Sequence, residues 1–156
     1  MIQALEIKWA APAAVKLPQS ACSLLHGVLM EQIDSAYADF LHQNALRPYS
    51  QYLHFEKEKN ALYWRITALN EEAKNEILAP AFALPQTVLL KQKNIELQLV
   101  SKELLPATDY GSLAEKYFTQ TLASRYLSLD FITSCSFKSE GQYVIFPQVP
   151  FLLRSL

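Results

Sequence analysis

A histidine and an arginine stand close together where an amphipathic segment of this sequence ends. The stretch ADFLHQNALRPYS places Arg47 five residues after His42 and directly before Pro48. Histidine can give or take a proton near neutral pH, and the permanently charged arginine can contact two oxygens of an anionic group. The pair therefore has the residue types of a proton-transfer site acting on an anion. The alternative is structural, because cations also suit the negative end of a helix and can cap its last carbonyl groups.

Other side chains could support this pair. Asp39 lies three residues before His42, so the two share a helical face and the carboxylate could orient the ring. His54 could face the site from a strand, although an exposed strand histidine is the commoner case. His26 lies sixteen residues before His42. At about 100° per residue of a single helix it falls well off that face, so we expect a packed or surface role for it.

Strand and helix patterns alternate in the part of the chain that must position these residues. Residues 2–9 alternate as a strand does. From Ser20 or Ser23 to about residue 43, apolar residues recur at spacings of three and four, which predicts one long amphipathic helix with a serine cap. Gly27 inside this helix suggests close packing of another backbone.

A hairpin and a second helix follow. Residues 50–58 and 61–69 predict its two strands, with the turn at Lys59-Asn60. Residues 70–84 predict a helix capped by Asn70, and residues 87–104 supply one or two more strands. The order β-α-β-β-α-β predicts an α+β fold with an N-terminal ferredoxin-like domain over residues 1–104. Trp9 and Trp64 are expected in its core.

The pattern restarts after Pro106. A helix is expected over residues 112–120, a strand over 128–137, a glycine-bearing turn and strand over 139–147, and the first turns of a helix from residue 149. We expect residues 105–156 to be the beginning of a second ferredoxin-like domain that is truncated.

Composition narrows the classes of function. The 156 residues are 51% hydrophobic with a formal net charge of −1, which disfavours a strongly basic nucleic-acid binder but allows a local basic cleft. No stretch approaches the roughly 20 apolar residues of a membrane span, and no targeting segment is recognisable, so we expect a soluble, cytoplasmic protein. Cys22 and Cys135 lack the spacing of a zinc site, and no phosphate-loop or dinucleotide motif occurs, so neither metal nor cofactor is expected.

Two longer stretches carry a family resemblance. Residues 24–55, LLHGVLMEQIDSAYADFLHQNALRPYSQYLHF, resemble the first helix and following strand of the CRISPR-associated endoribonucleases of the RAMP superfamily, which cut precursor CRISPR RNA within its repeats. Leu41-His42 at the helix end and Pro48-Tyr49-Ser50 at the strand entry carry this likeness. Residues 129–156 resemble the opening of that family's second domain.

The resemblance implies a metal-independent endoribonuclease acting on CRISPR repeat RNA, in which the 2′-OH attacks the adjacent phosphate and leaves a 2′,3′-cyclic phosphate. His42 would then be the general acid or base and Arg47 the phosphate-side cation. Asp39, Tyr37, His54 and Ser50 are possible supporting residues. A CRISPR effector complex and a homodimer are possible assemblies, and the truncated chain alone is expected to bind weakly and cut slowly.

The sequence departs from the family pattern at three places. Met30 stands where some members have a catalytic tyrosine, Ser134-Cys135 replace a common Pro-Thr, and the family's C-terminal glycine-rich loop is absent. Two alternatives therefore remain: a RAMP-type subunit that holds CRISPR RNA without cutting it, and an unrelated α+β interaction domain. The sequence does not indicate which repeat is recognised, or whether it is read as a stem-loop or a single strand.

Overall fold

The computed structural model describes residues 1–10, 17, 21–43, 47–56, 58–59, 61–119, 126, 128, 137–139, 141–146 and 148–150. They fall within two compact units, residues 1–121 and residues 122–156. The predicted strand over 128–137 and the helix from residue 149 lie largely outside the described residues. None of the described helices is long and apolar enough to cross a membrane.

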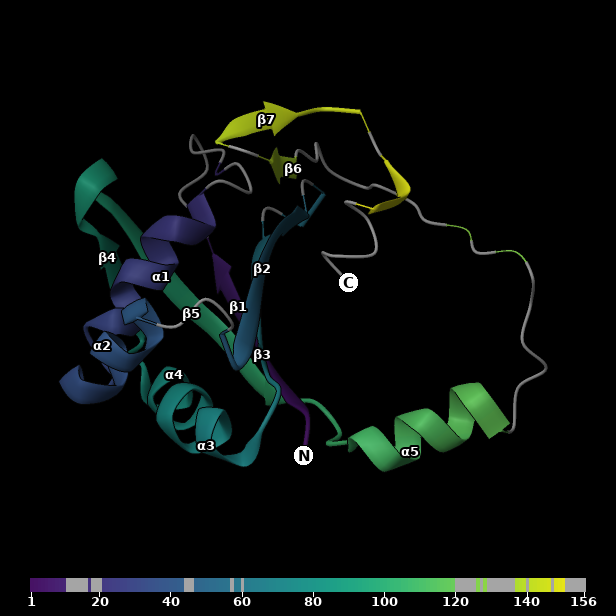
Figure 1. The fold of residues 1–156 in the computed structure, drawn as a ribbon. Coiled ribbons are helices and arrows are strands. Elements are labelled where there is room, and N and C mark those ends of the chain that lie inside the picture. Colours follow the sequence, from purple (N-terminus) through teal and green to yellow (C-terminus); the bar gives the residue numbers. More distant parts are fainter. Residues whose placement is uncertain are drawn as a thin grey trace. The chain divides into compact units, whose positions relative to one another are not determined.

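An antiparallel sheet of five strands, in the order β2-β3-β1-β5-β4, organises the first unit (Figure 1). The strands are β1 Gln3–Ala10, β2 Tyr49–Glu56, β3 Ala61–Ala68, β4 Thr87–Leu90 and β5 Ile95–Leu104. The predicted strand at the N-terminus, the predicted hairpin and the strand pattern before residue 104 therefore share one sheet. The pattern over residues 87–104 gives two strands, and β4 adds an edge to the sheet.

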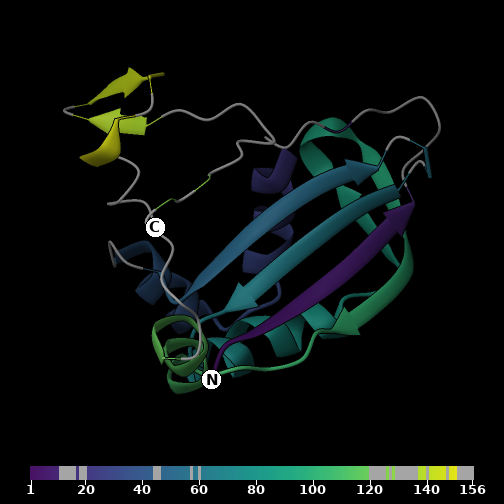
Figure 2. The same cartoon turned by 90° about the vertical axis from the view of Figure 1, so that its right-hand side faces the viewer.

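The alternation of apolar side chains decides which face of the sheet the helices cover. Leu5, Ile7 and Trp9 of β1 are fully buried, and their neighbours Glu6 and Lys8 are not. Helices α1 Cys22–Met30, α2 Ser35–Gln43, α3 Glu71–Ala73 and α4 Ala79–Ala83 lie on the buried face (Figure 1). Figure 2 looks onto the opposite face, which these helices leave uncovered. The expectation that both tryptophans belong to the core is confirmed, since Trp64 is also fully buried.

The single long helix predicted up to residue 43 is wrong, because the chain forms two helices separated by a turn at residues 31–34. At this turn the Asp34 carboxylate accepts hydrogen bonds from the backbone N–H groups of Ala36 (2.9 Å) and Tyr37 (3.2 Å), which begins α2. An aspartate that satisfies free N–H groups stabilises a new helix start. Ser23 is not the predicted cap, because α1 begins after Ala21 with no side-chain cap, and Ser20 lies outside the described residues.

The second predicted helix is present and has an unusual interior. The Asn70 side chain accepts a hydrogen bond of 2.8 Å from the Ala73 N–H, which confirms the predicted cap. Between α3 and α4 the backbone widens into a π-helical segment, η2 Lys74–Leu78. Pro80 has no N–H, and its ring would clash with the carbonyl four residues earlier in a regular helix. The wider turn immediately before Pro80 relieves this clash.

Short elements complete the two units. A 3₁₀ turn, η3 Lys91–Lys93, joins β4 to β5, and helix α5 Tyr110–Ala114 continues into the π-helical segment η4 Glu115–Thr119. The second unit contains a hairpin of β6 Phe137–Ser139 and β7 Gln142–Val144. Its turn uses Gly141 at φ 78°, a backbone conformation that glycine adopts without strain. The predicted glycine-bearing turn leading into a strand is therefore confirmed.

Candidate functional site

The break between α1 and α2 changes which histidines can act together. His42 lies exposed in the last turn of α2, and Arg47 is exposed just before β2 begins. His26 lies in the middle of α1, half-buried. The charge of Arg47, and that of His42 when it is protonated, both act on His26, so the three side chains form one electrostatic group.

Tyr49 joins this group from the first residue of β2. Its hydroxyl oxygen lies 3.0 Å from Nδ1 of His26, which is a hydrogen-bond distance. The two rings are nearly parallel, with an interplanar angle of 17° and centroids 6.4 Å apart. We call His26, His42, Arg47 and Tyr49 the two-histidine cluster.

The surroundings of the cluster favour the neutral forms of the half-buried His26 and the buried Tyr49. Burial lowers the pKa of His26, and the charges of Arg47 and then His42 lower it further. Burial raises the pKa of Tyr49, against a smaller lowering by Arg47. Near neutral pH the cluster therefore contains a neutral imidazole, a protonated phenol and the fixed charge of an arginine, which together can exchange a proton beside an anion.

This environment predicts a pH-dependent stability that His26 contributes. The pKa of His26 is lower in the folded chain than its ordinary 6.5, so the unfolded chain takes up the proton first as the pH falls. The contribution is fully present above pH 6.5 and is lost below it. We expect the denaturation midpoint of the wild-type chain to fall more between pH 7.5 and pH 5 than that of His26→Gln. Equal losses in the two chains would contradict the assigned environment.

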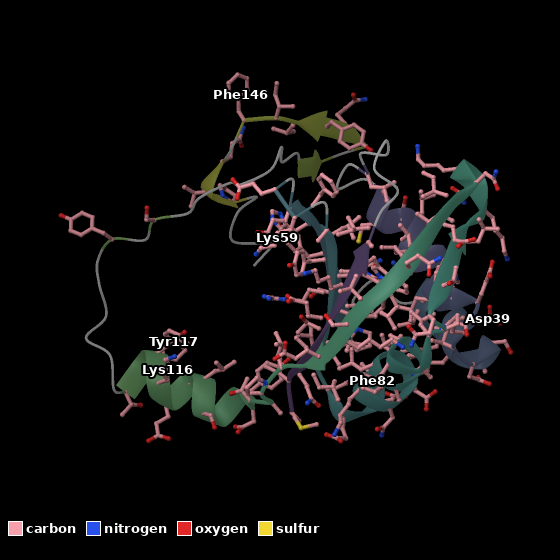
Figure 3. All side chains as sticks on the ribbon, turned by 180° about the vertical axis from the view of Figure 1, so that it is seen from behind. Asp39, Lys59, Phe82, Lys116, Tyr117 and Phe146 are labelled. Atoms are coloured by element: carbon pink, nitrogen blue, oxygen red, sulfur yellow. The ribbon has the colours of Figure 1, made fainter. Side chains whose placement is uncertain are left out.

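The predicted supporting residues do not all lie near the cluster. Asp39 lies on the outer surface of α2 (Figure 3), and no hydrogen bond joins its carboxylate to His42 within the described part of the chain. Ser50 and His54 alternate with the buried Tyr49 and Leu53 along β2. They therefore face the side of the sheet opposite to the helices, and the ring of His54 stacks there on Tyr52.

Tyr37 belongs to the core and not to the cluster. It is 8% exposed, and its ring stacks on Phe40 at a centroid distance of 5.6 Å. Burial raises its pKa, and the carboxylates of Glu72 and Glu76 raise it further. Its buried hydroxyl has no hydrogen-bond partner among the described residues.

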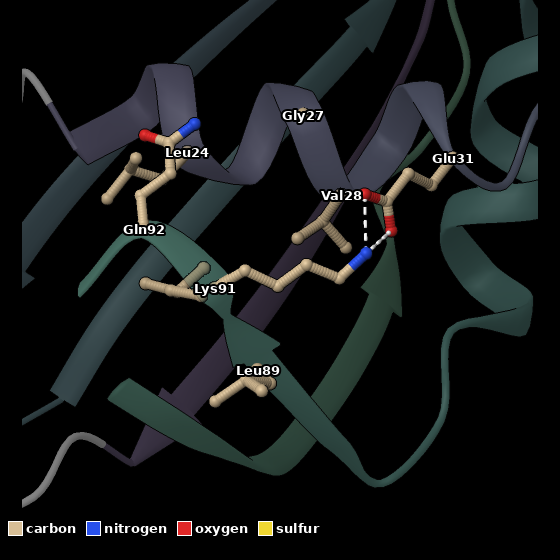
Figure 4. A pocket seen from close by; sticks show the side chains of 8 residues that line it. Leu24, Gly27, Val28, Glu31, Leu89, Lys91 and Gln92 are labelled. Carbon is tan, nitrogen blue, oxygen red and sulfur yellow. Dashed lines mark hydrogen bonds and ion pairs between the residues drawn. The ribbon is translucent and has the colours of Figure 1, made fainter. Parts of the chain in front are cut away.

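The hollow beside α1 is separate from the cluster. It has a volume of about 150 Å³ and lies between α1 and the β4–η3 corner, where the Lys91 ammonium contacts the Glu31 carboxylate at 2.8 Å (Figure 4). Gly27 lines this hollow, and a Cβ built at Gly27 would meet nothing within 4 Å. The expectation that another backbone packs closely against Gly27 is therefore wrong.

Cysteine and metal chemistry add little to the described site. Burial raises the pKa of the Cys22 thiol to about 11, so this cysteine stays protonated and unreactive near neutral pH. Within the described ranges, no three His, Cys, Asp or Glu side chains are grouped to hold a metal ion.

The fold and the cluster define an α+β protein with a candidate acid–base site for an anionic substrate. Sequence comparison then connects it to a class of enzymes. The chain is 32% identical to the CRISPR-associated endoribonuclease Cas6 of Mycobacterium tuberculosis, in strains CDC 1551 / Oshkosh and ATCC 25618 / H37Rv, over 136 residues. It is 30% identical over 131 residues to the enzyme of the same name from Streptococcus thermophilus.

These relationships confirm the resemblance seen in the residues: the chain is a relative of the Cas6 endoribonucleases. The alignments cover 85% and 84% of this chain, but only 41% and 51% of the two enzymes. The chain thus spans about half the length of the curated relatives it matches. No protein-family model matches it.

Proposed function

We propose that this chain provides the catalytic histidines of a metal-independent endoribonuclease that cuts CRISPR repeat RNA. The observation that carries the proposal is the two-histidine cluster within a chain related to Cas6 along most of its length. That relationship argues against an unrelated interaction domain. The strand order β2-β3-β1-β5 also supports a ferredoxin-like arrangement of the first unit, with β4 as an addition.

The proposed reaction needs two proton transfers and one fixed charge. The 2′-oxygen attacks the adjacent phosphorus as its proton passes to a base, and the bond from phosphorus to the 5′-oxygen breaks as that oxygen gains a proton. The neutral ring of His26 is suited to the first transfer, and His42 to the second. Arg47 would contact the phosphate oxygens while negative charge builds up on them.

A cleavage assay without metal tests this proposal. The 156-residue chain is incubated in EDTA with RNA containing a repeat from the CRISPR array of the source genome. We expect slow cleavage that leaves a 2′,3′-cyclic phosphate and a 5′-hydroxyl. The same RNA with a 2′-deoxy nucleotide at the cleavage position should stay intact, because the nucleophile is missing.

The alternative of a subunit that binds without cutting makes a different prediction. Met30 in place of a catalytic tyrosine favours this alternative, because a thioether cannot transfer protons. Under it, the repeat RNA would bind and remain uncut in the presence of the wild-type chain. Binding without any cleavage would therefore replace the endoribonuclease proposal with the binding-subunit function.

A further inference from the structure

The His26 ring is held in one orientation by a neighbour on another element. Tyr49 Oη lies 3.0 Å from His26 Nδ1, and the near-parallel stacking of the two rings fixes the ring plane. Tyr49 is itself 7% exposed at the start of β2, a strand paired along its whole length with β3. A sheet residue therefore holds a helix histidine in place.

This contact distinguishes the two ring nitrogens, because the Tyr49 hydroxyl lies beside Nδ1. A neutral imidazole carries one proton, and the nitrogen without it is the proton acceptor. A tyrosine hydroxyl can either accept a hydrogen bond from Nδ1–H or donate one to Nδ1. Only the first arrangement leaves Nε2 with a free lone pair. Because burial raises the pKa of Tyr49, its oxygen keeps its proton and remains a neutral acceptor.

We propose that Tyr49 is the positioning residue of His26, and that its hydroxyl oxygen accepts a hydrogen bond from Nδ1–H so that the lone pair of Nε2 can take the proton of the RNA 2′-OH. This inference rests on the proposed function. It follows the general arrangement in which a third group orients a catalytic base through the nitrogen that does not react. A phenol replaces the usual carboxylate here, so the base is oriented without a negative charge beside the RNA.

Nitrogen NMR of the imidazole rings tests the tautomer directly and requires no cleavage. In the ¹⁵N-labelled wild-type chain at pH 7.5 we expect the neutral His26 ring to be protonated at Nδ1. In Tyr49→Phe, which removes only the hydroxyl oxygen, the ring should become a mixture of both tautomers. Tyr110→Phe is the matched control, because it removes a hydroxyl bonded to the Leu69 carbonyl at 3.2 Å and should leave His26 unchanged. A wild-type ring protonated at Nε2 would overturn the inference.

Cleavage kinetics test whether Tyr49 acts through His26. We expect Tyr49→Phe to slow single-turnover cleavage about ten- to a hundredfold at saturating enzyme, with little change in RNA affinity. The double variant His26→Gln/Tyr49→Phe should be no slower than His26→Gln alone, because the orienting group has lost its base. If the two single losses instead multiply, Tyr49 acts independently of His26 and the positioning role fails.

The two proposals fail in different ways. If no chain cuts the RNA, wild type included, while the Nδ1-protonated tautomer is present and depends on Tyr49, the proposed function fails and the orienting contact stands. If the wild-type chain cuts and Tyr49→Phe has the wild-type tautomer and rate, the inference fails and the proposed function stands. Circular dichroism at the assay temperature identifies a variant that has not folded. If Tyr49→Phe does not fold, the tautomer of His26 in the wild-type chain tests the inference: protonation at Nδ1 supports it and protonation at Nε2 overturns it.

Discussion

Replacing His42 by alanine is expected to slow single-turnover cleavage of repeat RNA by about two to four orders of magnitude. The expected loss is large because the leaving 5′-oxygen would depart without a proton donor. RNA affinity should stay nearly unchanged, since the exposed ring at the end of α2 contributes little binding surface. Rates at saturating enzyme and binding by filter retention separate the two effects.

Gln43→Ala is the matched control for this experiment. Gln43 is the next residue, is also exposed and belongs to the same last turn of α2. Its replacement should leave the cleavage rate unchanged. A His42→Ala chain that cuts at the parental rate would show that His42 only caps the helix. Arg47→Ala should differ from both, slowing cleavage and also weakening binding, because a phosphate contact serves both steps.

Trp64→Ala should cost about 3–5 kcal/mol of unfolding free energy, a large part of the roughly 5–15 kcal/mol available to a typical domain. Trp64 is fully buried in β3, between Leu53 of β2 and Ile7 of β1. Its indole N–H also donates a hydrogen bond of 3.1 Å to the Gln51 side chain. The substitution therefore creates a cavity and leaves the amide oxygen of the half-buried Gln51 without its partner.

Urea denaturation measures this loss, and the buried Trp9 remains as the fluorescent probe. The matched control is Tyr63→Ala at the preceding position of β3, whose side chain points to the uncovered face and is only half-buried. It should cost about 1 kcal/mol or less, because the contacts that it removes lie at a half-buried surface: the Lys8 ammonium, 5.4 Å from the ring centroid, and the hydrogen bond with the Glu56 carboxylate. Similar losses for the two variants would contradict the assignment of the core face.

The sheet could be predicted from the sequence because each strand is indicated by the alternation of its own consecutive residues. In β1 and β3, alternating apolar residues identify the covered face, and both tryptophans are buried on it as expected. Asn70 is an equally local signal, since a cap acts on N–H groups only a few residues away. For such elements, short-range pattern and tertiary packing require the same structure.

The helix break and the contact of His26 with Tyr49 could not be predicted in this way. Apolar spacing continues through Ile33, which is buried, so the periodicity hides the turn at residues 31–34. Asp34 was the available signal, as an aspartate three residues before a core tyrosine can start a helix. The contact between His26 and Tyr49 joins positions 23 residues apart and depends on how α1 packs on β2. No local pattern contains that information.

Because a turn separates α1 from α2, the distance between His26 and His42 is not set by the pitch of one helix. Within one continuous helix, a residue inserted between them would rotate every later side chain by about 100° and ruin the buried face. Here each helix has its own buried anchors, Leu29 in α1 and Leu41 in α2, while Glu31 and Gln32 between them are exposed. Ile33 is buried and Asp34 begins α2, so only the two exposed positions before them could take an insertion that leaves both buried faces unchanged. In the proposed site, this loop, and not the pitch of one helix, would therefore set the distance between the proton acceptor His26 and the proton donor His42.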